Sequence, residues 1–171
     1  LGLGLRPREI IPTPKRRSVS SLTLKQKCRW ILFAFIPSSL MLSVTTFLSM
    51  EVAAIPLLWI IPLSLYLFTF ILVFTFPPGP FLRFTSWILP FTLLPLIFLM
   101  ATGANSPIAL VALIHLITFF FLSLHFHGRL SKERPESGFL TSYYFYHSLG
   151  GILGGIFKAL TATVLFNGIW E

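Results

Sequence analysis

The chain has 171 residues, of which 55% are hydrophobic and 11% are charged, with a formal net charge of +8. Because a soluble domain carries about 25% charged residues, this composition excludes a surface that faces water on all sides and indicates an integral membrane protein. The single cysteine, Cys28, excludes an internal disulfide and a cysteine metal site.

Residues 1–29 are expected to form an extended basic arm with little structure of its own. The arm holds eight of the 13 Lys and Arg residues. Next to a hydrophobic span, such a cluster marks the cytoplasmic side and contacts anionic headgroups, so membrane lipids are expected partners. A nucleic-acid partner is disfavoured because no fold signature of a nucleic-acid binder accompanies the charge. The residues expected at the headgroups are Arg16, Arg17, Lys25, Lys27 and Arg29.

Five apolar segments follow, each close to the length that an α-helix needs to cross a hydrocarbon core of roughly 30 Å. They show no alternation of period two, which excludes membrane strands. The sequence therefore predicts an all-α, polytopic bundle of about five transmembrane helices. The spans are expected at about residues 30–48, 54–76, 84–100, 107–126 and 141–166.

The distribution of basic residues predicts how these spans are oriented. With the amino terminus inside, the segments 1–29, 77–83 and 127–138 are cytoplasmic and hold 12 of the 13 Lys and Arg residues. Positive-inside bias sets orientation, so we expect a cytoplasmic amino terminus. An odd number of spans leaves Glu171 outside, from which we expect the chain to continue.

A polar stripe runs along the first span. Ser39, Ser43 and Thr46 follow i, i+4, i+7 spacing and therefore share one helix face. Such hydroxyls usually bond to their own helix or to a neighbouring one. The lining of a pore is the less favoured alternative.

The fifth span contains the run HSLGGILGGIFKAL at residues 147–160. A dinucleotide cradle needs GxGxxG after a strand, which this run lacks. Small residues four apart instead favour close contact with another helix, and the pattern leaves open whether that helix belongs to this chain. The two ladders consist of Gly150 with Gly154, and of Gly151, Gly155 and Ala159.

Lys158 is the one basic residue inside a span, and it projects to nearly the same side as His147. A charge at the centre of a bilayer costs at least ~2.5–3.5 kcal/mol. Two interpretations stay open for Lys158. It snorkels to the outer surface or pairs with a carbonyl, or it forms an ion-pair or substrate site, for which Glu51 is the acidic candidate near the outer side.

Intramembrane histidines can ligate haem or a chlorophyll-type pigment. His115 and His147 are weak candidates, since they are expected at different depths. His125 and His127 lie at the inner edge of the fourth span, where a role at headgroup level suffices. Structural histidines are favoured, so neither a cofactor nor a metal is predicted.

The chain has five acidic residues and no Asp, and no nucleophile with a base is recognisable, so an enzyme is not expected.

Two stretches of the chain are specific enough to compare with a known family. They read FIPSSLMLSVTTFLSMEVAAIPLLWIIPLSLYLFTFILVF at 35–74 and HGRLSKERPESGFLTSYYFYHSLGGILGGIFKALTATVLF at 127–166. Both resemble the membrane region of bacterial fused MFS/spermidine synthase-like proteins. The resemblance implies a bacterial inner membrane location and a soluble spermidine synthase-like domain after the helices. The cofactor loop of that domain has no counterpart here, so aminopropyl transfer is not assigned to this chain.

Three positions depart from the family pattern. Arg129 replaces the glutamate of the family's HGEL loop, Lys158 stands near a usual asparagine, and His147 replaces an apolar residue. We interpret the two changes at the glycine face as a site reshaped for a specific partner.

The predicted function is that of a non-catalytic structural or assembly subunit, which packs on a larger membrane complex through the glycine-rich helix. One alternative is a transport module for polyamine or another small solute, although a cation path calls for intramembrane carboxylates. Another is the membrane anchor of an aminopropyltransferase-like enzyme whose soluble domain lies beyond residue 171. The last alternative is a subunit that binds haem or a pigment.

Overall fold

The computed structural model describes residues 22–52, 57–103 and 107–167, with side chains for 22–50, 57–103 and 107–161. Every regular element in these ranges is a helix, which confirms the predicted all-α class. Two short elements are the π-helical turn η1 (Leu48–Val52) and the 3-10 turn η2 (Ser137–Phe139). The α-helices are α1 (Leu24–Phe47), α2 (Ile60–Thr75), α3 (Pro78–Thr102), α4 (Ile108–Lys132) and α5 (Leu140–Asn167).

Three helices within the described ranges are long and apolar enough to cross a membrane. They are α1 with the start of η1 (Leu24–Met50), α3 and α4. α2 has 16 residues. At 1.5 Å per residue it is about 24 Å long, shorter than a hydrocarbon core of roughly 30 Å. α5, whose first half carries Thr141, Ser142 and His147, is not among the three. The result is compatible with a membrane location and supports the first, third and fourth predicted spans.

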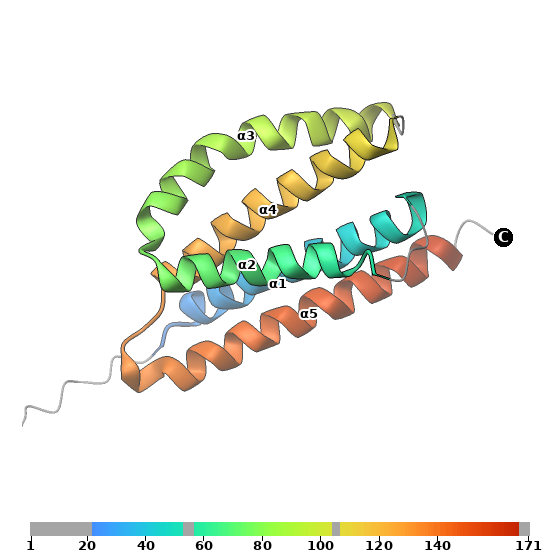
Figure 1. Cartoon of the computed structure of the whole chain (residues 1–171). Coiled ribbons are helices and arrows are strands. Elements are labelled where there is room, and N and C mark those ends of the chain that lie inside the picture. Colours follow the sequence, from blue (N-terminus) through green and yellow to red (C-terminus); the bar gives the residue numbers. More distant parts are fainter. Residues whose placement is uncertain (1–21, 53–56, 104–106, 168–171) are drawn as a thin grey trace, which may run out of the picture.

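The helices pack as an antiparallel bundle with α1 and α4 at its centre (Figure 1). α5 packs along α1, α3 packs along α4, and α2 lies against both central helices. Successive helices run in opposite directions (Figure 1). The start of α1, the α2–α3 turn and the α4–α5 connection therefore meet at one end of the bundle.

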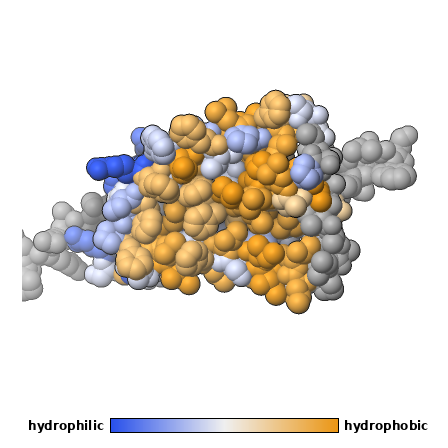
Figure 2. All heavy atoms as spheres, turned by 45° about the horizontal axis from the view of Figure 1, so that its top comes forward, coloured by the Kyte–Doolittle hydropathy of each residue, from blue (hydrophilic) through white to orange (hydrophobic). Residues whose placement is uncertain are grey.

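This end, which we call the basic end, is the hydrophilic part of the molecule. Hydrophobic side chains dominate the remaining length of the visible face (Figure 2). Arg29 of α1 forms an ion pair here with Glu133, the residue after α4. The positive charge of the described chain, Lys158 apart, is thus segregated to one end, as the positive-inside pattern predicts. The basic residues at this end are Lys25, Lys27, Arg29, Arg83, Arg129, Lys132 and Arg134.

Two clusters of buried side chains hold the helices together. Near the basic end, the indole of Trp30 meets the ring of Tyr143 edge-on, with 5.2 Å between ring centroids. The Tyr143 hydroxyl donates a hydrogen bond to the Leu130 carbonyl at 2.9 Å, which ties α5 to α4. The first cluster consists of Trp30, Phe33, Leu130 and Tyr143, and the second, toward the other end, of Val44, Leu48, Ala112 and Phe119.

α1 begins earlier than the predicted first span because a capping box starts it. The Thr23 hydroxyl accepts a hydrogen bond from the Gln26 amide, and the Gln26 side chain accepts one from the Thr23 amide. This reciprocal pair of hydrogen bonds fixes the first turn of the helix. The expectation that residues 1–29 lack structure is therefore wrong for residues 24–29. Arg16 and Arg17 lie outside the described residues.

α3 is the most exposed of the described helices, and Thr85 is its one buried residue. The helix contains Pro90 and Pro95, each of which removes a backbone N–H donor, and it is bowed (Figure 1). α4 holds α3 in place in part through the Thr118 hydroxyl, which donates to the Thr92 carbonyl at 2.9 Å. Most of the apolar surface of α3 therefore lies on the outside of the bundle.

Candidate functional site at the α1/α5 interface

The first glycine ladder lies directly against the backbone of α1. A Cβ atom built on Gly150 would lie 2.3 Å from the Ile31 carbonyl oxygen. A Cβ atom on Gly154 would lie 2.7 Å from the Phe35 carbonyl oxygen. Real Cβ atoms do not approach carbonyl oxygens so closely, so only glycine permits this spacing of the helices. Glycine pairs at such a contact allow Cα–H···O interactions with the facing helix, which are weak but recurrent between closely packed helices.

The second ladder lies at the margin of this interface. A Cβ atom on Gly151 would lie 3.5 Å from the Ser38 hydroxyl, and one on Gly155 would lie 3.8 Å from Leu42 Cδ1, both ordinary contacts. Ala159 is exposed. The partner helix that the sequence left open is therefore α1 of this chain, and α1 occupies the face that we expected to dock on another protein.

α1 accommodates the glycines because it is also narrow at the point of contact. Ala34 Cβ would lie 2.9 Å from the built Cβ of Gly150, and Ser38 Cβ would lie 3.1 Å from that of Gly154. Ala34 and Ser38 are four residues apart and form a small-xxx-small pair of their own. Sequence reasoning missed this pair. The match between the two patterns was the available signal.

Next to the glycine contact, three helices, α2, α4 and α5, contribute a cluster of polar and aromatic side chains. His127 of α4 is fully buried, and its Nδ1 lies 3.0 Å from the Thr69 hydroxyl of α2. Its ring meets Tyr66 and Phe70 edge-on, at centroid distances of 4.8 Å and 5.3 Å. The opposite face of the cluster comes from α5, where His147 stacks on Phe70 at 5.5 Å. We call these five residues the histidine cluster.

This arrangement gives His127 packing contacts that the sequence did not predict, because α4 runs through the centre of the bundle and turns His127 toward α2 and α5. The headgroup-level depth of His127 stays a prediction. His125, two residues away, points to α3 instead, where its Nδ1 lies 2.9 Å from the Thr85 hydroxyl. The Nε2 atoms of His127 and His147 are buried without a hydrogen-bond partner among the described residues.

The histidine cluster touches the glycine interface through one hydroxyl pair. Ser38 Oγ lies 3.4 Å from the Tyr66 hydroxyl, so the residue that faces Gly154 also contacts the cluster. Hydroxyls and imidazoles can hold a water or a small polar ligand and can relay a proton. Within the described residues, no three metal-ligating side chains come together.

Replacing Thr69 by valine is expected to destabilise the fold by about 1–3 kcal/mol, because it leaves a buried nitrogen of His127 without its partner. The free energy of unfolding in mixed detergent micelles measures this loss. Thr102→Val is the matched control, since the exposed Thr102 hydroxyl donates to the carbonyls of its own helix at Phe98 and Leu99. Equal losses of unfolding free energy in the two variants would show that the hydrogen bond between Thr69 and His127 does not stabilise the fold.

The polar stripe of the first span bonds within α1. Ser39 donates to the Ile36 carbonyl at 3.0 Å, and Ser43 donates to the Ser39 carbonyl at 2.9 Å. Thr46 donates to the Leu42 carbonyl at 2.8 Å. The hydroxyls therefore donate their hydrogen bonds to carbonyls of their own helix, as serine and threonine commonly do in membrane helices.

His115 lies apart from the histidine cluster. Its ring stacks on Phe47 at 4.2 Å, its Nδ1–H donates to the Val111 carbonyl at 2.8 Å, and its Nε2 is buried without a partner in the described part of the chain. Twelve residues of α4 separate His115 from His127, which is about 18 Å along the helix axis. His115 and His147 therefore do not form a ligand pair.

The remaining predicted site residues are charged. Lys158 is half-buried on α5, and no described residue forms an ion pair with it; the side chain of Glu51 lies outside the described residues. At the basic end, Lys27 Nζ lies 5.6 Å from the centroid of the Tyr146 ring, while Arg29 is paired with Glu133.

Comparisons with known proteins identify no relative. No family model, curated protein or solved structure matches this chain. The resemblance of residues 35–74 and 127–166 to the membrane region of spermidine synthase-like proteins stays a prediction, and the properties of the site follow from its geometry alone.

Proposed function

We propose that the chain is a non-catalytic membrane module that acts as a structural or assembly subunit of a larger membrane complex. In this proposal the basic end faces the cytoplasm, and the membrane is the bacterial inner membrane that the family resemblance implies. The observation that carries the proposal is Lys158, a cation in the apolar part of α5 that no described residue pairs.

The position of Lys158 makes snorkelling of its ammonium group to the nearer membrane surface unfavourable. It lies nine residues before Asn167, the last residue of α5, which is about 14 Å of helix. Helical side chains lean toward the amino-terminal end, so Lys158 leans away from the nearer end of its helix. A carboxylate or a carbonyl of a neighbouring helix would remove the cost of leaving this ammonium in hydrocarbon.

Exposed apolar side chains near Lys158 are available to such a neighbour. Phe157 and Leu160, on either side of Lys158 in the sequence, are 54% and 62% exposed, and Ile156 is 50% exposed. Because α1 covers Gly150 and Gly154, docking through α5 uses the exposed side chains around Lys158 and not the glycine ladder. The predicted use of the glycine-rich helix is retained, with its stretch after the glycines as the contact.

Replacing Lys158 by leucine is expected to abolish co-purification of the partner while the chain itself stays folded. The measurement is the intact mass of the gently solubilised native protein, together with the stoichiometry of the proteins that accompany it. Leu160→Ile, a conservative change two residues farther along α5, serves as the control and should keep the complex. A native chain that runs alone at its own mass would contradict an assembly role, and a much larger single polypeptide would favour the membrane anchor of an enzyme.

A second candidate is a haem or pigment-binding subunit. The specific observation in its favour is the pair of buried Nε2 atoms on His127 and His147, which face no hydrogen-bond partner in the described part of the chain. An absorption spectrum of the purified protein tests it. A Soret or chlorophyll-type band that His127→Leu removes would favour this candidate over the assembly role.

A further inference from the structure

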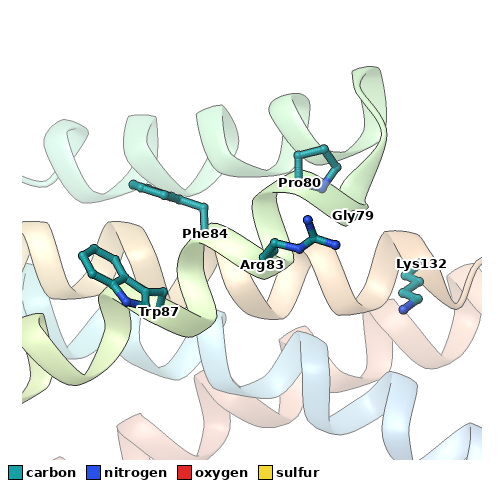
Figure 3. Close-up of a pocket in the computed structure, with 6 residues that line it drawn as sticks. All are labelled: Gly79, Pro80, Arg83, Phe84, Trp87 and Lys132. Carbon is teal, nitrogen blue, oxygen red and sulfur yellow. The ribbon is translucent and has the colours of Figure 1, made fainter.

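An open pocket with two basic side chains lies at the basic end, where α3 begins and α4 ends (Figure 3). Its volume is about 810 Å³. Arg83 comes from the second turn of α3, and Lys132 is the last residue of α4. The lining consists of Gly79, Pro80, Arg83, Phe84, Trp87 and Lys132.

The positive charge of the pocket is not neutralised by the described protein. Arg83 and Lys132 are exposed, and neither forms an ion pair or a hydrogen bond with a described residue. Glu133 follows Lys132 directly, but its carboxylate is paired with Arg29 of α1. No acidic side chain lines the pocket. The positive end of the α3 dipole adds to the same potential.

The two cations lie at successive depths along the bundle. Leu82 packs against Gly128, with Leu82 Cδ2 3.2 Å from a Cβ atom built there, so Arg83 lies near the level of Gly128. Lys132 is four residues closer to the end of the bundle, which is about 6 Å of helix. An anionic group bound between these two levels would lie within reach of both long side chains.

Below the cations the lining becomes aromatic. Trp87 follows Arg83 by four residues and so lies on the same face of α3, about 6 Å farther from the basic end. Trp87 is 66% exposed and Phe84 is 51% exposed, and both belong to the lining of the pocket (Figure 3). Amphipathic aromatic rings are typical of the depth at which headgroups give way to acyl chains.

We propose that this pocket binds an anionic phospholipid of the leaflet at the basic end. Arg83 and Lys132 hold the headgroup phosphate, and Phe84 and Trp87 contact the glycerol region and the first part of an acyl chain. The order of cations, aromatic rings and apolar helix surface matches the order of polar and apolar groups along a phospholipid. Guanidinium and ammonium groups are the usual protein partners of phosphate.

The proposal rests on the membrane placement of the chain and not on Lys158 or on the assembly role. The test uses the full chain, solubilised gently and incorporated into nanodiscs that contain phosphatidylglycerol and phosphatidylcholine. Native mass spectrometry then measures the lipids that the protein retains. We expect selective retention of phosphatidylglycerol.

The variant with Arg83→Gln and Lys132→Gln should bind phosphatidylglycerol about thirtyfold more weakly, because each basic group near an anionic surface contributes roughly a fivefold factor. The matched control is Arg129→Gln with Arg134→Gln, which removes the same charge from exposed residues at the same end, outside the pocket and outside the set expected at the headgroups. We expect its retention of lipid to stay within a factor of two or so of that of the original chain.

Equal losses in the two double variants, or equal retention of phosphatidylcholine, would overturn the proposed site. Displacement of the lipid by millimolar inorganic phosphate would assign the pocket to free phosphate instead, which also contradicts the proposal. Alkaline extraction of membranes distinguishes a failure of the membrane placement from a failure of the lipid site alone. A chain that washes out overturns the membrane placement, whereas a retained chain without lipid selectivity overturns the lipid site alone.

Discussion

Replacing Gly150 by alanine is expected to destabilise the bundle by about 3 kcal/mol, a typical cost of overpacking a close contact. The added methyl group would lie 2.3 Å from the Ile31 carbonyl oxygen, an atom of the α1 backbone that cannot rotate away. α1 and α5 must therefore move apart, and the contacts around the histidine cluster loosen with them. Unfolding by a denaturing detergent, followed by circular dichroism, measures the change.

Gly155→Ala provides the matched control for this prediction. It places the same methyl group on the same helix, 3.8 Å from Leu42 Cδ1. Since alanine favours a helix over glycine by about 1 kcal/mol, this variant should be neutral or slightly stabilised. The two substitutions are therefore expected to have opposite signs. If both variants stabilise the helix by a similar amount, α1 and α5 do not pack through Gly150.

Replacing Trp30 by alanine is expected to cost about 3–5 kcal/mol, the range observed for removal of a large buried side chain. Trp30 is 0% exposed and fills the space between α1, α4 and α5 at the basic end. Loss of the indole removes the edge-on contact with Tyr143 and leaves a cavity beside that residue, whose hydroxyl donates to the Leu130 carbonyl. The midpoint of detergent unfolding, followed by circular dichroism, measures the effect.

Trp59→Ala is the control for the size and chemistry of the substitution. Trp59 is 50% exposed at the start of α2, so its removal leaves no internal cavity. We expect this variant to lose less than about 1 kcal/mol, as is usual for partly exposed positions. Trp30→Phe should fall between the two alanine variants, because it retains an aromatic ring in the cluster. Comparable losses for Trp30→Ala and Trp59→Ala would show that the cluster does not hold the helices together.

The helix boundaries could be predicted from the sequence only where composition changes. Apolar composition marks the hydrocarbon-depth part of a helix, but the helix continues wherever its backbone can still be satisfied. α3 begins at Pro78, six residues before the expected span, because prolines are tolerated in the first turn of a helix. α4 likewise continues to Lys132, where basic side chains complement the negative end of the helix dipole.

The candidate site could be predicted in part. The spacing of Gly150 and Gly154 predicted a close helix contact, since a missing side chain is a local property. The spacing did not identify the partner, which depends on where Ala34 and Ser38 lie on a helix more than a hundred residues earlier. The histidine cluster joins α2, α4 and α5, and no local pattern in the chain indicates it.

The sequence by itself determined the helical class, the segregation of positive charge to one end and the presence of small-residue ladders on α5. Each of these follows from local composition or periodicity, because apolar helices and charge placement depend on neighbouring residues. Only the tertiary structure decided which ladder meets α1 and that His127 is buried. It also decided that Arg83 and Lys132 share one pocket. These outcomes depend on how helices distant in the sequence rotate and pack, which is fixed by the shapes of both surfaces at once.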